Sequence, residues 1–374
     1  MNNKIIGITA ILAVLMILLG GFSVNGFFTF SGGDKVVIGA VIPLSGSGAF
    51  FGEQLNAGMQ MALDEINANG GIDGKKLELV LEDSVGDPAT AISAYNNLLL
   101  KSPLAVITAF SAPSVVLSPL SKQNQVPLLI TLASAVDVTL PSEYAFRFFS
   151  TSDLDAPIIA NYLLDKNYKK FAIIYLNDDY GQTYLKSFSR VVESRGGSVV
   201  AQENFLRGTT DVKTQLLKIK SSGAQVLYVV GYDKDYETIF RQVKEMDLKV
   251  QLAGNWILAN PTVIKLVGEN ANGAYMTTTD YYLDSKNNSS NFSNKFKEKY
   301  SKNADAYSAF GYDSVMILAK TIEQFGSGPE QIKTGLTKIK YAGLLGEISF
   351  DKARESNFDL YPAIIENGKV VLIE

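Results

Sequence analysis

Residues 36–83, VVIGAVIPLSGSGAFFGEQLNAGMQMALDEINANGGIDGKKLELVLED, decide the fold of this chain. They begin with a continuous apolar run at residues 36–42, which is typical of a parallel strand buried on both faces. Pro43 ends the run, and apolar residues then recur at helical spacing from Leu55 to Ile66. After a turn rich in Asn and Gly, residues 76–82 alternate like a half-buried strand. The stretch therefore predicts one βαβ unit and an α/β fold.

The loop at residues 44–52 is a candidate ligand-binding element. Ser45 and its neighbouring serine and glycines offer hydroxyl groups and unobstructed backbone N–H groups just before a helix begins. Such a loop favours polar or anionic ligand groups. A plain surface turn between strand and helix has the same composition, so the loop alone does not assign a site.

Composition limits the classes of function. The chain has 374 residues, 47% of them hydrophobic, which is enough for two cores. Its net charge of −4 is made of interspersed charges without a basic stripe, so we expect no nucleic-acid partner. The chain has no Cys and no His, which excludes disulfides, thiol catalysis, Ser-His-Asp hydrolysis and most catalytic zinc sites. We expect a protein that is not an enzyme and that needs no cofactor or metal.

Two enzyme classes are the alternatives to this expectation. A hydrolase that uses scattered Asp and Glu side chains lacks a recognisable acid/base pair in this sequence. A dinucleotide-binding enzyme needs a third glycine after Gly46 and Gly48, and Phe51 stands at that position. Both alternatives are therefore disfavoured.

Residues 1–31 predict a signal peptide or an N-terminal membrane anchor. Lys4 precedes an apolar run at residues 5–19, as in a secretory signal, but no A-x-A-like cleavage site follows. The apolar character continues to Phe30, and this length is enough to cross a bilayer. With Lys4 on the short side, both alternatives place the remaining chain outside the cytoplasm.

The rest of the chain alternates apolar strands with amphipathic segments of helix length. This alternation predicts parallel sheets flanked by helices. We expect further strands near residues 104–108, 126–131, 170–175, 198–204, 226–230, 251–253 and 273–277, with helices between them. Towards the C-terminus we expect helices near residues 290–302, 306–324 and 330–339, and then short strands.

The segment from Pro43 to Leu79, which begins Pro-Leu-Ser-Gly-Ser-Gly and ends Asn-Gly-Gly-Ile-Asp-Gly-Lys-Lys-Leu-Glu-Leu, resembles the extracytoplasmic solute-binding proteins of branched-chain amino-acid ABC transporters, and the resemblance continues to the C-terminus. It implies a type I periplasmic binding fold, in which two Rossmann-like lobes are joined by a hinge that the chain crosses three times. The crossings would lie near residues 150–153, 280–282 and 343–346. The first lobe would then hold residues 35–151 and 282–343, and the second lobe residues 152–281 and 344–374.

The resemblance also implies a function. Proteins of this kind bind a small amino-acid-like, amide or carboxylate ligand between the lobes and deliver it to ABC permease subunits. We expect an extracytoplasmic monomer that closes about its hinge. A ligand-sensing ectodomain of the same fold, without transport, is the alternative.

Two strand-end loops of the first lobe resemble the loops with which this family holds a ligand carboxylate. Ala112 falls on the family's carboxylate-binding serine, and Ser111 lies one place earlier. In the second loop, the carbonyl and N–H positions fall on Ala133 and Ala135, and Ser134 supplies a hydroxyl. A helix cap and a turn would also favour serine at these places.

Two tyrosines of the second lobe match the family better. Tyr180 lies in the strand-end motif Asn-Asp-Asp-Tyr-Gly, and Tyr232 follows a second strand. A tyrosine ring can cover apolar ligand surface while its hydroxyl forms a hydrogen bond. In the first loop, Ser45 and the aromatic residue Phe51 would form the lip of the same site.

Trp256 is the main departure from the family. It stands where the amino-acid binders have a glutamate that pairs with the ligand's ammonium group. Trp cannot form an ion pair, so an aliphatic α-amino acid is in doubt, although cation–π attraction remains available. Asp280, or Asp153, near the implied crossings, would be the alternative source of negative charge.

Overall fold

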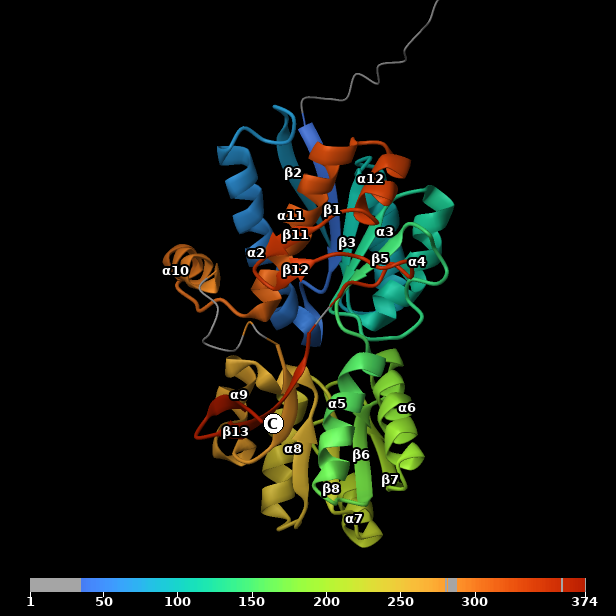
Figure 1. The fold of residues 1–374 in the computed structure, drawn as a ribbon, viewed down its shortest axis with the longest axis vertical. Helices are drawn as coiled ribbons and strands as arrows, with labels where there is room; N and C mark the ends of the chain where they lie inside the picture. Colours follow the sequence, from blue (N-terminus) through green and yellow to red (C-terminus); the bar gives the residue numbers. More distant parts are fainter. Residues whose placement is uncertain (1–34, 280, 282–287, 358, 374) are drawn as a thin grey trace, which may run out of the picture. The chain divides into compact units, whose positions relative to one another are not determined.

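The computed structural model describes residues 35–279, 281, 288–357 and 359–373. From Val36 onward the described chain forms one compact unit with two large sheets, each flanked by helices, and a separate two-stranded sheet (Figure 1). We call the two large sheets and their helices the first and second lobe. The α/β fold with two parallel-sheet cores is therefore confirmed. The predicted signal or anchor at residues 1–31 lies outside the described residues, and no helix within them is long and apolar enough to cross a membrane.

The first sheet has the strand order β2-β1-β3-β4-β5, and β1, β3, β4 and β5 pair in parallel. Its strands are β1 (Lys35–Ile42), β2 (Lys76–Asp83), β3 (Ala105–Ala109), β4 (Leu128–Thr131) and β5 (Ala145–Phe148). Its helices are α2 (Ala49–Ala68), α3 (Pro88–Leu99), α4 (Ser111–Asn124), α10 (Asn288–Tyr300), α11 (Ala306–Phe325) and α12 (Pro329–Leu336), with the short η1 (Gly46–Gly48).

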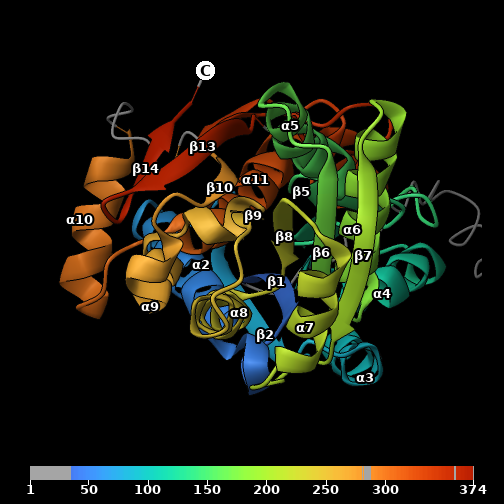
Figure 2. The same ribbon diagram turned by 90° about the horizontal axis from the view of Figure 1, so that it is seen from below.

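The second sheet has the order β14-β13-β10-β9-β8-β6-β7, in which β13 and β14 pair antiparallel at one edge (Figure 2). Its strands are β6 (Lys170–Leu176), β7 (Ser198–Phe205), β8 (Val226–Val230), β9 (Gln251–Gly254), β10 (Tyr275–Thr278), β13 (Tyr361–Glu366) and β14 (Lys369–Leu372). Its helical segments are α5 (Ser152–Asp165), α6 (Asp179–Ser194), α7 (Lys213–Ser222), α8 (Asp233–Glu245), α9 (Pro261–Val267), η2 (Trp256–Ala259) and η3 (Gly268–Ala271).

Two glycines bring α11 back onto the first lobe, although it follows all the parallel strands of the second. A Cβ atom at Gly58 of α2 would lie 1.8 Å from the carbonyl oxygen of Ser308. A Cβ atom at Gly311 of α11 would lie 2.0 Å from the carbonyl oxygen of Leu55. The backbones of the two helices therefore pack directly against each other, and this contact holds the start of α11 against the first lobe.

The third crossing lies later than we predicted. Residues 343–346 form the tight turn between β11 (Tyr341–Gly343) and β12 (Gly346–Ile348) instead. The chain then pairs with the first sheet, where Glu355 bridges to Arg147, and it joins the second sheet only at β13. The turn is held by Asp313 of α11, whose carboxylate accepts the N–H groups of Leu344 and Leu345, both at 3.0 Å.

We expect Asp313 to make stability depend on pH. Burial raises the pKa of Asp313 from its ordinary value of 3.8 to about 7, so the folded chain binds more protons than the unfolded chain between these values. The free energy of unfolding should therefore fall as pH rises from about 4 to about 7. Asp313→Asn should make this fall shallower, because the amide does not titrate. Urea unfolding of both proteins at pH 5 and pH 8 gives the change in the free energy of unfolding between these pH values. An equal change in Asp313→Asn and in the parent would contradict the prediction.

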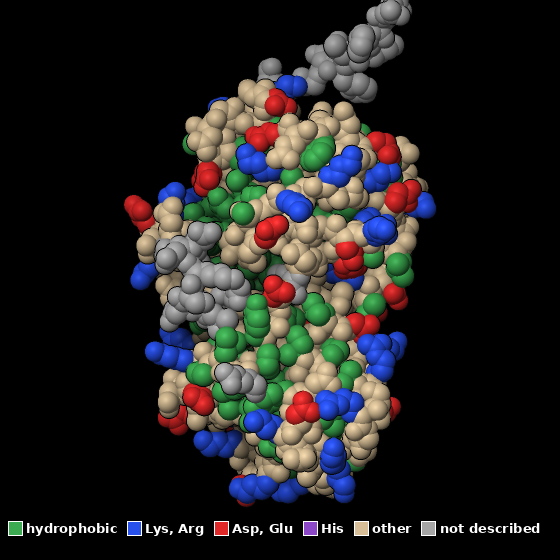
Figure 3. Space-filling model, in the orientation of Figure 1, with side chains coloured by type: hydrophobic (Ala, Val, Ile, Leu, Met, Phe, Trp, Pro, Cys, Tyr) green, Lys and Arg blue, Asp and Glu red, His purple; other side chains and the backbone are tan. Residues whose placement is uncertain are grey.

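Lys, Arg, Asp and Glu side chains are spread over the face shown in Figure 3 without forming a patch of one sign. This distribution agrees with the interspersed charges of the sequence.

Candidate ligand-binding site

A small cavity lies where the carboxyl ends of both sheets meet. Its volume is about 10 Å³, room for about one water molecule. Ten described residues line it; seven of these side chains are aromatic, and none of the ten is charged. The first lobe contributes Phe51, Phe110, Leu132, Ser134, Phe149 and Tyr307, and the second lobe contributes Tyr180, Tyr232, Trp256 and Ile257.

Tyr232 is at the centre of the aromatic contacts. Its ring stacks on Phe110 of the first lobe, with centroids 5.3 Å apart and planes 27° apart. It also meets Phe51 edge-on at 5.2 Å and stacks on Tyr180 of its own lobe at 5.1 Å. These distances lie in the favourable range for aromatic pairs. The two lobes therefore touch through aromatic rings at the point where the strands end.

Trp256 reaches from the second lobe into the first. Its ring lies 5.0 Å from Phe149, 5.5 Å from Tyr307 and 6.2 Å from Phe310, all measured between centroids. The side chain is only 3% exposed. Its indole Nε1–H has no acceptor among the residues that the structure describes.

Two lining residues have positive φ angles, which residues other than glycine rarely adopt. Phe110, directly after β3, has φ 72° and ψ 149°, and Leu132, directly after β4, has φ 52°. Such conformations cost about 1–3 kcal/mol each and cluster at functional sites. Gly48 makes room for the Phe110 ring, because a Cβ atom there would lie 2.7 Å from its Cε2. Gly48 of the first loop thus leaves the space that this ring of the aromatic wall occupies.

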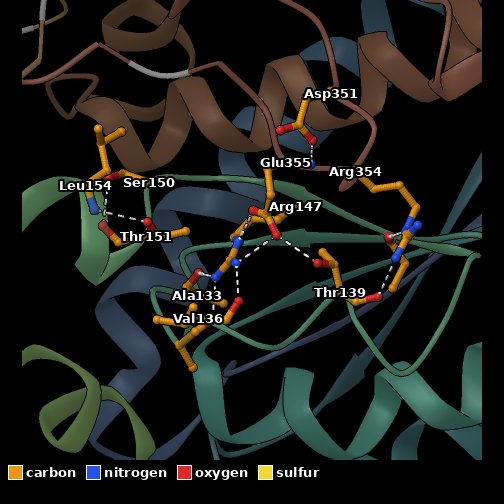
Figure 4. Close-up of polar contacts among 12 residues, drawn as sticks. Ala133, Val136, Thr139, Arg147, Ser150, Thr151, Leu154, Asp351, Arg354 and Glu355 are labelled. Carbon is orange, nitrogen blue, oxygen red and sulfur yellow. Dashed lines mark hydrogen bonds and ion pairs between the residues drawn. The ribbon is translucent and has the colours of Figure 1, made fainter. Parts of the chain in front are cut away.

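A buried arginine fixes the loop that carries Ser134. Arg147 of β5 is fully buried, and its guanidinium donates to the carbonyls of Ala133 (3.2 Å), Ala135 and Val136 (2.7 Å). It also forms a two-pronged ion pair with Glu355, with Nη2 to Oε1 at 2.8 Å (Figure 4). Every N–H group of the guanidinium has an acceptor. Arg147 therefore joins the loop at residues 133–136 to the segment that precedes β13.

Residues 35–367 match the family model described as periplasmic binding protein. The chain belongs to this family. The leucine-, isoleucine-, valine-, threonine- and alanine-binding protein of Pseudomonas aeruginosa is 25% identical over 349 residues, 91% of this chain and 93% of that protein. Leu/Ile/Val-binding protein homolog 2 of Brucella abortus is 28% identical over 337 residues, 87% of this chain and 89% of that protein.

A solved relative agrees with these matches. The substrate-binding protein of a branched-chain amino-acid transporter from Streptococcus pneumoniae, in complex with isoleucine, is 30% identical with a TM-score of 0.82. The match covers 90% of this chain and 97% of that chain. The predicted resemblance is confirmed, and with it a solute-binding function. Periplasmic binding proteins bind small molecules outside the cytoplasm and work with ABC permeases.

Five of the predicted site residues line the cavity of this periplasmic binding protein. They are Phe51, Ser134, Tyr180, Tyr232 and Trp256. The cavity brings them together from four strand-end loops and the start of α2. Their contact with ligand stays a prediction.

The structure places the other predicted residues elsewhere. The carbonyls of Ala133 and Ala135 are bound by Arg147, and the Ala135 N–H donates to Ser111 Oγ at 3.1 Å. Ser45 is exposed, and its Oγ donates to Asp83 Oδ2 at 2.5 Å. Ala112 lies in the first turn of α4 and does not line the cavity. Asp280 lies outside the described residues.

Five residues of the lining were not predicted from the sequence. Phe110, Leu132 and Phe149 each come directly after a strand of the first sheet, and this position is the signal that would have found them. Ile257 comes directly after Trp256. Tyr307 had no such signal, because it reaches the cavity only through the contact between α11 and α2.

Two buried carboxylates lie near the cavity, and one of them, that of Asp235, holds the lining residue Tyr232. Asp235 Oδ2 accepts the N–H of Tyr232 at 2.9 Å, and Asp155 accepts the hydroxyls of Tyr184 and Thr277. Burial raises the pKa of both carboxyl groups to about 6. Neither residue is part of the cavity lining.

A polar contact joins the two lobes beside the rings. Asn260 caps α9 in the second lobe, and Asp305 caps α11 in the first. The Nδ2 of Asn260 donates to Asp305 Oδ2 at 3.2 Å. This hydrogen bond links the start of α9 in the second lobe to the start of α11 in the first.

Proposed function

We propose that this chain is the solute-binding component of an ABC importer. It binds a small amino-acid-like, amide or carboxylate ligand at the aromatic cavity and delivers it to permease subunits, without an enzymatic step. It acts as a monomer outside the cytoplasm, with residues 1–31 as signal peptide or anchor. The observation that carries this proposal is the direct contact of aromatic side chains from both lobes at the carboxyl ends of both sheets.

Opening of the lobes is part of the proposal. Ligand sites for small molecules usually hold about 300 Å³ or more, whereas this cavity holds about 10 Å³. A ligand therefore enters when the faces of Tyr232 and Phe110 separate, and the lobes then close on it. The ligand shifts the equilibrium from the open to the closed form by the difference between its binding free energies for the two forms. This difference drives hinge closure.

The relatives support a ligand of this size and chemistry. The relatives from Pseudomonas and Brucella are named for leucine, isoleucine and valine, the first also for threonine and alanine, and the solved relative is in complex with isoleucine. These are small molecules with an apolar body, a carboxylate and an α-ammonium group. The apolar lining of the cavity suits such a body.

A thermal-shift panel tests the proposed function. The full-length chain in a mild detergent is heated with amino acids, amides, small aromatic acids, polyols and nucleosides. A ligand at 100 times its Kd should add about 2.7 kcal/mol to the stability of the folded chain and raise Tm visibly. Polyols and nucleosides are the matched controls, because neither class carries a carboxylate or an amide side group on an apolar body. A panel without any shift would contradict the proposal.

A further inference from the structure

Among the residues that the structure describes, the cavity lining has no group that would pair with an ammonium ion. None of its ten side chains is an Asp or a Glu. The nearby carboxylates of Asp235 and Asp155 are occupied by Tyr232, Tyr184 and Thr277. The carboxylate of Asp305 accepts from Asn260 and Ser308. A buried cation without a counter-charge is strongly unfavourable. Within the described residues, the site is therefore unsuited to the amine of an α-amino acid.

The lining does offer a free donor. Trp256 Nε1–H is buried, lines the cavity and has no acceptor among the described residues. An indole nitrogen donates only, so the group that would satisfy it is a hydrogen-bond acceptor. A buried donor without a partner is destabilising, and a ligand oxygen would remove that penalty.

The start of α4 favours negative charge on the first-lobe side of the cavity. Phe110 is its N-cap residue, no side chain caps the helix, and no acidic residue lies in its first turn. In contrast, α8 of the second lobe has Asp233 and Asp235 in its first turn. Helix starts attract anions unless acidic side chains are already there. Trp256 lines the same cavity as Phe110, and its ring packs against Phe149 and Tyr307 of the first lobe.

The two central rings favour a flat ligand. Phe110 and Tyr232 stack across the lobes with their planes 27° apart. A planar ring that enters between them replaces one ring contact by two, and the lobes separate by only about one ring thickness, ~3.5 Å. A branched aliphatic chain is thicker and has no face to stack. The geometry therefore selects aromatic over aliphatic bodies.

We propose that the ligand is a planar aromatic carboxylate without an ammonium group. Its ring lies between Phe110 and Tyr232, and its carboxylate accepts the Nε1–H of Trp256. This proposal rests on the proposed solute-binding function and names the substrate class of the same site.

Four matched probes test the ligand class by calorimetry on the full-length chain. Benzoate has the ring and the carboxylate, cyclohexanecarboxylate lacks the planar ring, L-phenylalanine adds the ammonium group, and L-leucine lacks the ring but has the ammonium group. Benzoate should bind at least about tenfold more tightly than each of the others. Tighter binding of L-leucine or L-phenylalanine would overturn the ligand class and leave the solute-binding function standing. Absence of benzoate binding would also overturn the ligand class. The solute-binding function itself is tested by the wider thermal-shift panel.

Two variants test the role of the indole N–H. Trp256→Phe keeps an aromatic ring and removes the donor, so benzoate affinity should fall by about ten- to a hundredfold. Tyr228→Phe is the matched control, because Tyr228 is a fully buried residue of β8 whose hydroxyl also has no partner in the described chain and does not line the cavity. Its benzoate affinity should stay unchanged. Unchanged benzoate affinity in Trp256→Phe would overturn the assignment of the carboxylate to this donor.

Discussion

Arg147→Met should lower the free energy of unfolding by about 3–5 kcal/mol, the usual effect of breaking a buried ion pair from one side. The Arg147 side chain is 1% exposed, and that of Glu355 is 22% exposed. Met replaces the aliphatic part of the Arg side chain but has no donor, so it leaves Glu355 without its counter-charge. It also leaves the carbonyls of Ala133, Ala135 and Val136 without their partner. Urea unfolding of both proteins measures the difference.

Arg195→Met is the matched control for this prediction. Arg195 pairs with Asp165 at 2.7 Å, but the two side chains are 42% and 64% exposed. Exposed pairs contribute about 0–1 kcal/mol, so this variant should unfold almost like the parent. A loss below 1 kcal/mol in Arg147→Met would contradict the role that we assign to Arg147.

Tyr232→Ala should weaken ligand binding about thirtyfold or more, because a central aromatic residue of a binding site usually contributes 2 kcal/mol or more. Tyr232 is half-buried at the start of α8 and packs against rings of both lobes. Its replacement should therefore change affinity more than it changes the free energy of unfolding. Calorimetry with the strongest binder of the panel gives the Kd.

Tyr232→Phe separates the ring from the hydroxyl. This variant keeps the stacking on Phe110 and Tyr180, so its Kd should stay within a fewfold of the parent value. An unchanged Kd in Tyr232→Ala would remove Tyr232 from the site. An equal loss in both variants would assign the effect to the hydroxyl instead of the ring.

The sequence predicted most of the fold, because buried parallel strands are continuous apolar runs. Residues 226–230 and 170–175, for example, lie within β8 and β6. The strand β5 was missed, since it has only four residues and a charged one, Arg147, interrupts its apolar pattern. Burial of that charge depends on Glu355, which is 208 positions away in the chain. No local pattern reveals such a partner.

The candidate site was predicted only in part for the same reason. Tyr180, Tyr232 and Trp256 follow strands, and position after a strand is visible in the sequence. Ala133 and Ala135 also follow a strand, but Arg147 uses their carbonyls. Tyr307 reaches the cavity because Gly58 and Gly311 allow two distant helices to touch. Contacts of this kind become visible only in three dimensions.

The fluorescence of Trp256 tests the central claim most directly. It is the only Trp of the chain, and its ring packs against Phe149 and Tyr307 across the lobes. If a solute binds between the aromatic faces, titration of the full-length chain with the strongest binder of the panel should change the emission. The change should saturate at the Kd that calorimetry gives. Heat of binding without any change in emission would show that the ligand binds elsewhere, and it would contradict the account.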